Sequence, residues 1–293
     1  MHYRKTATLN GGGGNMFKLF LAFILLAFGA PLEGGAAMLV AARESFAISR
    51  AKRFTNPYVT DGLIAWWDGV WNAGLGKHAT SLTAWMDLVG GDVLTVYGPA
   101  LSIDGNAVKI VKGGGATYLR SESTRYINLL LTKKFTIELV FASPGYTSGE
   151  HVGASPISIQ ADSARQLVYD IRTGTSATKG GCLQYRQSGW GSEANRITNV
   201  NVDFNNAHTF VFRDNNAQRC EFGLDGAMTA FSRTGSNLAT TTSVRLGLNQ
   251  YDAAAGTKNE NFVFHGIRIY NRALTLVEVA ANHAADRARF NLT

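Results

Sequence analysis

Residues 261–290 read NFVFHGIRIYNRALTLVEVAANHAADRARF, which suggests one strand, a corner and a closing helix. Apolar residues crowd into 262–270 around a central glycine, which is typical of a strand with a bulge. Thr275 is followed three residues later by Glu278, the spacing of a capping box. In that motif each side chain bonds a backbone N–H left unpaired at the helix start. We therefore predict a strand over 262–270 and a helix over about 276–289.

The predicted helix is rich in alanine, and such a helix packs flat, so we expect it to lie on a sheet. We expect one side of the helix to pack inward and the other to face solvent. The inward residues are expected to be Val279, Ala280, His283 and Ala284, and the outward residues Asn282, Asp286, Arg287 and Arg289.

The run GIRIYNRALTLVEVAANHAADRARF at 266–290 resembles the closing motif of laminin-G-like, concanavalin A-like jelly-roll domains. DGLIAWWD at 61–68 and DLVGG at 87–91 resemble the first strand and the following turn of that family. HTFVF at 208–212 and CEFGLDG at 220–226 resemble a later strand pair. The resemblance covers roughly 60–290. It implies an all-β jelly-roll β-sandwich of two antiparallel sheets with a short C-terminal helix.

Such domains have diverse functions, so the resemblance transfers little chemistry. It implies calcium binding as an option, because many relatives hold this ion. No Asp/Asn cluster in the sequence matches a calcium-ligand loop, so no metal is assigned. No other cofactor is expected.

Short apolar alternations divided by Gly, Asn and Asp turns predict a series of strands through the body of the chain. Asp225-Gly226 predicts a hairpin turn, because both residues tolerate positive φ. The predicted strands are Leu63–Trp67, Asp92–Tyr97, Ala107–Val111, Thr117–Arg120, Lys134–Ala142, Pro156–Gln160, Gln166–Ile171, Cys182–Arg186, His208–Arg213, Arg219–Leu224, Val244–Leu248 and Phe262–Tyr270.

The charge of the chain is unevenly distributed. The net charge is +7, but residues 1–60 hold seven Lys/Arg and two Glu, whereas the remainder holds 21 basic and 19 acidic residues. A basic tail on a near-neutral body does not favour a nucleic-acid partner. We predict two regions: an apolar leader with a basic helical arm over 1–59, and a sandwich domain over 60–293.

Residues 19–30, LFLAFILLAFGA, form a twelve-residue apolar run. A membrane-spanning helix needs about twenty such residues, whereas this length suits a signal-peptide core with a cleavage site at 35–37. This interpretation predicts a secreted or cell-surface protein whose leader contacts the membrane during export. The competing interpretation is an amphipathic or buried helix that docks on a partner, as in a virion component.

Two cysteines, Cys182 and Cys220, lie in predicted strands, and their spacing fits no metal motif. Two buried thiols and a cross-strand disulfide are both compatible with the sequence. Of the tryptophans, we expect Trp85 in the core. Trp66 and Trp67 are consecutive, so one is expected in the core and the other outside or under a loop.

Catalytic groups are hard to find in the sequence. Sandwich glycosidases commonly carry Glu-x-Asp-x-Glu on one strand, and this chain has no such triplet. Glu221 and Asp225 come nearest, although Asp225 is better explained as the turn residue before a glycine. Glu138 stands alone and is expected on a solvated face. His208 and His265 are expected to be structural. These observations predict that the protein is not an enzyme.

Sugar binding requires aromatic rings for stacking beside polar groups. Trp190 lies in a Gly/Ser loop, where it either contacts a ligand or anchors the loop, with Tyr185 and Arg186 nearby. Asn249 and Tyr251 fall in the loop after a predicted strand. These five residues are the candidate ligand-binding set.

The sequence favours non-catalytic recognition of a glycan or another surface ligand, including a protein. A structural or assembly component of a cell surface or a bacteriophage particle is the alternative. A glycoside hydrolase or polysaccharide lyase on the same scaffold is the third hypothesis.

Overall fold

The computed structural model separates the chain into two compact units, Met1–Ile48 and Ser49–Thr293, and the fold below concerns the second. The predicted leader at 1–59 lies almost wholly outside the described residues, so the boundary at residue 59 stays a prediction. The structure describes residues 56–72, 76–78, 81–111, 117–121, 123–126, 129, 132, 134–145, 154–162, 165–173, 179–186, 196–197, 202–215, 219–232, 245–248 and 261–292.

One sheet has nine strands among the described residues, all paired antiparallel, and we call it the nine-stranded sheet. β1 (Leu63–Asp68) lies off the main path and pairs with β19. The main path runs β17 (Ala227–Ser232), β16 (Arg219–Leu224), β15 (His208–Asn215), β10 (Lys134–Ala142), β19 (Phe262–Tyr270), β8 (Ala107–Ile110), β7 (Leu101–Asp104) and β4 (Ser81–Leu82).

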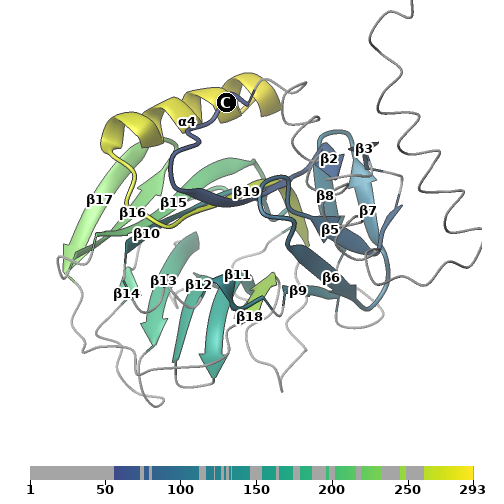
Figure 1. The fold of residues 1–293 in the computed structure, drawn as a ribbon, viewed down its shortest axis with the longest axis horizontal. Coiled ribbons are helices and arrows are strands. Elements are labelled where there is room, and N and C mark those ends of the chain that lie inside the picture. Colours follow the sequence, from purple (N-terminus) through teal and green to yellow (C-terminus); the bar gives the residue numbers. More distant parts are fainter. Residues whose placement is uncertain are drawn as a thin grey trace, which may run out of the picture. The chain divides into compact units, whose positions relative to one another are not determined.

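The second sheet, the eight-stranded sheet, is also antiparallel throughout its described strands and lies opposite the first (Figure 1). A two-stranded ribbon, β2 (Trp71–Asn72) with β3 (Gly76–Lys77), and a 3-10 turn, η1 (Thr124–Tyr126), complete the β region. The order of the eight strands is β14 (Arg196–Ile197), β13 (Lys179–Arg186), β12 (Arg165–Thr173), β11 (Ala154–Asp162), β18 (Arg245–Leu248), β9 (Tyr118–Ser121), β6 (Val93–Tyr97) and β5 (Ala84–Met86).

β19 holds the nine-stranded sheet together. β10 pairs along one of its edges, while β8 and β1 share the other, so β19 joins the first strand of the sandwich to β8 and β10. Val140 pairs with Gly266 and Phe141 with Phe264, which leaves His265 as the extra residue of a bulge. The bulge predicted at the central glycine is therefore confirmed.

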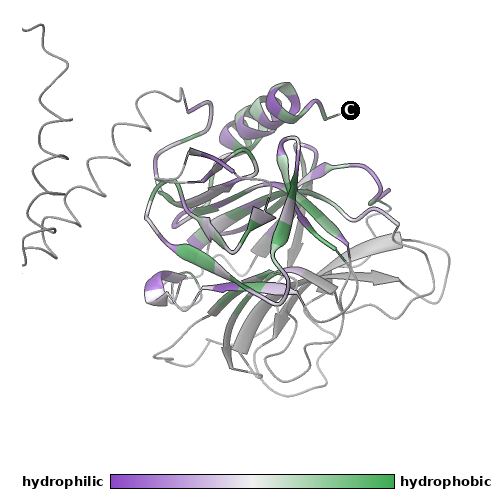
Figure 2. Cartoon of the chain, turned by 90° about the vertical axis from the view of Figure 1, so that its right-hand side faces the viewer, coloured by the Kyte–Doolittle hydropathy of each residue, from purple (hydrophilic) through white to green (hydrophobic). Residues whose placement is uncertain are grey.

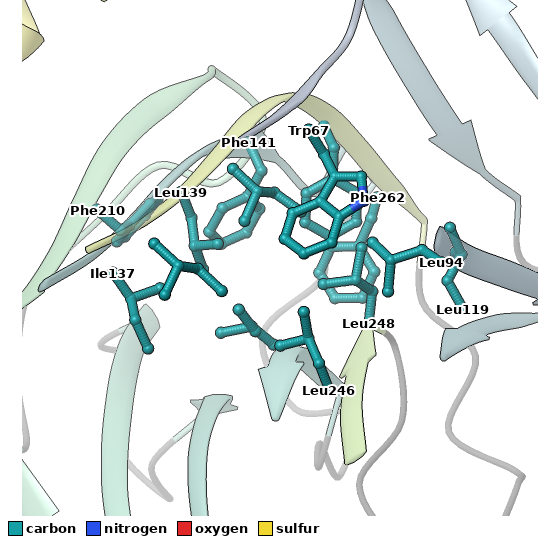
Figure 3. Packing of buried hydrophobic residues seen from close by; sticks show 14 of the residues in the cluster. Trp67, Leu94, Leu119, Ile137, Leu139, Phe141, Phe210, Leu246, Leu248 and Phe262 are labelled. Carbon is teal, nitrogen blue, oxygen red and sulfur yellow. The ribbon is translucent and has the colours of Figure 1, made fainter. Parts of the chain in front are cut away.

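The hydrophobic core fills the space between the two sheets, with side chains from both (Figure 3). Phe141 lies at its centre, with ring centroids 4.6 Å from Phe210 and 5.8 Å from Phe264. Trp67 and Trp85 are fully buried, and the Trp67 indole N–H donates to the Trp85 carbonyl at 3.1 Å. These contacts confirm the core positions expected for these tryptophans and the two-sheet sandwich predicted from sequence.

The hairpin between β16 and β17 is also confirmed. Asp225 has φ 51° and Gly226 φ 83°, so both central residues adopt the positive φ that this turn requires. The register then continues regularly from Leu224 opposite Ala227.

Helix α4 (Leu276–Phe290) lies on the outer side of the nine-stranded sheet (Figure 1). Thr275 caps it, and both hydrogen bonds of the predicted capping box with Glu278 are present. The helix contains both hydrophilic and hydrophobic residues (Figure 2). The helix ends at Asn291, whose φ of 54° is a left-handed cap.

The predicted orientation of α4 is wrong in part. Val279 is buried, as expected, but so are Asn282 and Asp286, which were expected to face solvent. Ala280 and Ala284, expected inward, are exposed. The helix therefore packs a polar stripe against the sheet, because buried charged side chains of the sheet form ion pairs and hydrogen bonds with it.

Candidate ligand-binding face

A buried charged cluster lies under α4 and contains Arg268, Glu138 and Asp286. Arg268 on β19 donates from Nε to Glu138 Oε2 at 2.7 Å, and from Nη1 and Nη2 to the two Asp286 oxygens at 2.7 and 2.6 Å. Asn282 on α4 donates to Glu138 Oε2 at 2.9 Å and to the Tyr270 hydroxyl at 2.9 Å. The expectation of a solvated Glu138 is therefore wrong, because Glu138 faces Arg268 across the β10–β19 pair.

This cluster is sealed from solvent. The side chains of Glu138 and Asp286 are 0% exposed and that of Arg268 is 1% exposed, with the Tyr58 ring 3.9 Å from the guanidinium. Burial, helped by the Asp286 charge, raises the pKa of Glu138 despite the nearby Arg268. Because these carboxylates are sealed from solvent and paired with Arg268, we assign them to docking of α4.

Glu221 and Asp225 do not form an acid pair in the structure. Glu221 forms an ion pair with Arg213, which also donates to the Leu274 carbonyl. Asp225 accepts from the Thr209 N–H at 3.0 Å and contacts His208 Nδ1 at 2.6 Å. Both carboxylates thus hold β15 in place.

The histidines expected to be structural have structural surroundings. His208 bridges Asp225 and the Asp203 carbonyl, and the Asp225 hydrogen bond raises its pKa against the effect of burial. His265 lies 5.2 Å from Phe290 between ring centroids, and burial lowers its pKa.

The outer face of the eight-stranded sheet, meaning the side away from the core, offers a different set of groups. Along β6 and β9, Leu94 and Leu119 point into the core and are fully buried. Their alternation partners Tyr97, Tyr118 and Arg120 therefore lie on the outer face, where all three are partly exposed.

These three side chains form a compact cluster. Tyr97 and Tyr118 are cross-strand partners with rings stacked at 4.8 Å and an interplanar angle of 7°. Arg120 lies 4.7 Å from the Tyr97 ring centroid and donates from Nη2 to the Tyr97 hydroxyl at 3.2 Å. Partly exposed aromatic rings beside a guanidinium can stack on a flat ligand and hydrogen-bond its polar groups.

Backbone register places Arg186 on the same outer face. Arg186 pairs with Gln166, Gln166 with Gln160, and Gln160 with Arg245, whose next outward position, Gly247, pairs with Arg120. Tyr185 instead shares a row with Leu167, Ile159 and Leu246, and the last two are buried in the core.

The five ligand-binding residues predicted from the sequence therefore have different positions relative to this face. Arg186 shares a face with the tyrosine cluster, whereas Tyr185 occupies a core-facing register position. Trp190, Asn249 and Tyr251 lie outside the described residues. Tyr97, Tyr118 and Arg120 are not among the ligand-binding residues predicted from the sequence, although their alternation with leucines was readable as a signal.

Cys182 lies in β13 and Cys220 in β16, so both are in strands, as predicted, but in different sheets. Within the part of the chain that the structure describes, no group of three or more His, Cys, Asp or Glu side chains could hold a metal ion. Calcium binding stays a prediction. No helix among the described residues is long and apolar enough to cross a bilayer.

No protein-family model and no curated protein sequence matches the chain. Among solved structures, Trypanosoma rangeli sialidase in complex with sialic acid aligns with TM-score 0.60 and 14% identity, covering 87% of this chain and 40% of that chain. A receptor binding domain aligns with TM-score 0.57 and 12% identity, covering 77% of this chain and 51% of that chain. The binding domain of botulinum neurotoxin DC, in complex with rat synaptotagmin II, aligns with TM-score 0.53 and 11% identity, covering 76% of this chain and 52% of that chain.

At these identities the similarity shows a shared fold alone. The prediction that the protein is not an enzyme is nevertheless wrong on this comparison, because the first similar structures are sialidases, and sialidases are enzymes. The missing carboxylate triplet therefore does not exclude catalysis. This chain spans only 33–40% of the length of those sialidases, so their activity does not come with the fold.

These three solved structures share the fold of this chain: it is an antiparallel β-sandwich similar to part of a sialidase, to a receptor binding domain and to the binding domain of a botulinum neurotoxin.

Proposed function

We propose that this domain is a recognition module that binds a glycan, or another surface ligand, on the outer face of its eight-stranded sheet. The observation that carries the proposal is the stacked Tyr97–Tyr118 pair with Arg120 beside it. Partly exposed aromatic rings bind the apolar faces of sugar rings, and guanidinium groups bind their polar substituents.

The outer side of the nine-stranded sheet is less suited to ligand binding. α4 covers the outer side of the nine-stranded sheet, and the charged groups beneath it are already paired with one another. Two of the similar structures are binding domains by name, one of them in complex with synaptotagmin and the other a receptor binding domain, which is consistent with a glycan or protein ligand.

In this proposal the domain is laminin-G-like and acts outside the cell, after export directed by the apolar leader. The closing-strand motif and the basic, apolar amino-terminal region support this setting. An assembly role in a cell surface or a bacteriophage particle is the alternative that the experiment below separates from recognition.

The test is a glycan-array screen of the full chain, with and without calcium, followed by affinity measurement on the best ligand. Tyr97→Thr and Tyr118→Thr remove the rings but keep a residue that favours strands. Each is expected to weaken binding about tenfold. Val277→Ala, at an exposed position of α4, is the matched control and should leave affinity unchanged.

A blank array in both conditions would refute recognition of glycans and favour the assembly role. Binding that survives both tyrosine substitutions would place the site elsewhere on the domain.

A further inference from the structure

Helix α4 is attached to the nine-stranded sheet by little apolar surface. The buried residues of this fifteen-residue helix are Val279, Asn282 and Asp286, so one fully buried side chain is apolar. Val279 belongs to a small buried cluster that is separate from the main core. The contact between α4 and the sheet is therefore mainly polar, and polar contacts that include titratable groups change with pH.

Two histidines lie along this contact, one on the helix and one on the sheet. His283 of α4 lies against the β16–β17 turn, where a Cβ on Gly226 would come 3.1 Å from its Cδ2 atom. His265 of β19 lies against Phe290, the last residue of α4, with ring centroids 5.2 Å apart.

Both imidazole rings are poorly placed to carry a charge. Their Nδ1 atoms are buried and have no hydrogen-bond partner in the part of the chain that the structure describes. A protonated imidazole carries a hydrogen on each ring nitrogen. The hydrogen on Nδ1 would therefore lack an acceptor while α4 is docked.

The charges around His283 do not reverse this preference. They come from the hairpin turn, from β19 and from α4 itself, and they are Asp225, Arg268, Asp286 and Arg287. Burial has the largest effect and lowers the pKa of His283 despite the two carboxylates. Asp225 is also hydrogen-bonded to His208.

His265 has fewer charged neighbours. Asp286 acts on it from α4, whereas Asp68 on the adjoining strand β1 is paired with Arg289. Burial has the largest effect and lowers the pKa of His265, despite Asp286 and a backbone hydrogen bond at Asn106. Both histidines are therefore neutral near pH 7 when α4 is docked.

Acidification then favours release of the helix. A histidine exposed by release titrates near its ordinary pKa of about 6.5, whereas the docked ring stays neutral to lower pH. Because the released state binds more protons, its population rises as pH falls below about 6.5. Glu138 acts in the opposite direction, because burial raises its pKa and it takes up a proton more readily beneath the docked helix.

We propose that α4 is an acid-sensitive lid on the nine-stranded sheet, and that protonation of His265 and His283 releases it. This inference is independent of the proposed ligand-binding face, which lies on the other sheet.

Hydrogen–deuterium exchange of the full chain at pH 7.5 and pH 5.5 tests the proposal, after correction for intrinsic exchange rates. A released helix of fifteen residues is marginal in water, so its amides exchange once it leaves the sheet. Between these pH values each histidine can raise the opening constant of α4 by up to about tenfold. Since Glu138 opposes the change, we expect a rise of at least about threefold. The amides of β10, in the same sheet, should show no such rise.

Variants then test the two histidines. His265→Gln and His283→Gln introduce an amide that does not titrate, and each should reduce the pH response of α4 by up to about tenfold. The double variant should show no rise on acidification. His78→Gln is the matched control, because burial also lowers the pKa of His78 but its ring lies against Trp85 and contacts the Asp68 carbonyl at 2.7 Å. This control should leave the response of α4 unchanged.

A second measurement uses the unmodified chain. NMR titration should give midpoints below 6.5 for His265 and His283. A midpoint at or above 6.5 for either ring would overturn the inference. So would an α4 response below about threefold, an equal response of β10, or a full response in the double variant.

Discussion

Replacing Arg268 by methionine tests how α4 is held on the sheet. The Arg268 side chain is 1% exposed and makes ion pairs with Glu138 at 2.7 Å and Asp286 at 2.6 Å. Methionine fills part of the volume but leaves two carboxylates buried without their cation. Removing one partner of a buried ion pair costs about 3–5 kcal/mol. A domain of this kind has a total stability of about 5–15 kcal/mol, so the loss is large.

The assay is urea unfolding at pH 7, followed by far-ultraviolet circular dichroism. We expect the free energy of unfolding of Arg268→Met to fall by about 3–5 kcal/mol. The control is Arg287→Met, an exposed position on the same helix, which should lie within about 0.5 kcal/mol of the wild type. Adding Glu138→Gln and Asp286→Asn to Arg268→Met removes the buried charges and should recover most of the loss.

The pH dependence gives a second check with a defined sign. Burial already raises the pKa of Glu138, whose ordinary value is 4.5, and Arg268 lowers it; the variant loses that lowering effect. A carboxyl with a raised pKa in the folded state binds protons more readily when folded. The unpaired carboxyl therefore destabilises the folded protein less as pH falls. The gap between wild type and variant should therefore narrow from pH 7 toward pH 5. A gap below about 1 kcal/mol at pH 7, or one that widens on acidification, would refute the reasoning.

Three further substitutions test local features of the domain. Asp225→Asn keeps a residue that tolerates the positive φ of the hairpin but removes the charge that raises the pKa of His208. The NMR titration midpoint of His208 should therefore fall toward or below 6.5. An unchanged midpoint would contradict the pairing of His208 with Asp225. The Arg272 hydrogen bond lowers the pKa of Glu278 to about 2, so its stabilising effect is fully present above about 4.5 and is lost as pH falls toward 2. Glu278→Gln should therefore cost about 1 kcal/mol in urea unfolding at pH 7 and less at pH 3, and an equal cost at both would count against the capping pair. A Cβ on Gly69 would lie 2.8 Å from the backbone carbonyl oxygen of His265. Gly69→Ala should therefore lower the free energy of unfolding by about 1–3 kcal/mol. No change in thermal unfolding would contradict this close contact and mean that the backbone relaxes there.

The architecture was readable from the sequence because it depends on local alternation. The bounds of β10, β16 and β19 match the predicted strands, since polar and apolar residues alternate in each or turn residues delimit it. The capping box was readable because both of its residues are neighbours in the chain.

The polar contact beneath α4 was not readable, because its partners are distant in sequence. Glu138 and Arg268 are 130 residues apart and become neighbours only through the β10–β19 pairing. Periodicity ranks Asn282 and Asp286 as solvent-facing, since it registers their polarity and not their partners. The one available signal was Arg268 itself, a charge inside an otherwise apolar run.

The candidate face required the strand order. Tyr97 and Tyr118 become neighbours because β6 pairs with β9, a pairing that no local pattern specifies. Arg186 was selected from the sequence for its nearness to Trp190. Its place beside Gln166 follows from the β12–β13 register.

The most direct measurement is a crystal structure of the full chain bound to the glycan with the highest affinity in the array. The account predicts ligand density on the outer face of the eight-stranded sheet, with a sugar ring against Tyr97 or Tyr118 and a polar group near Arg120. Ligand bound at α4, or held by loops without any contact to those three residues, would contradict it.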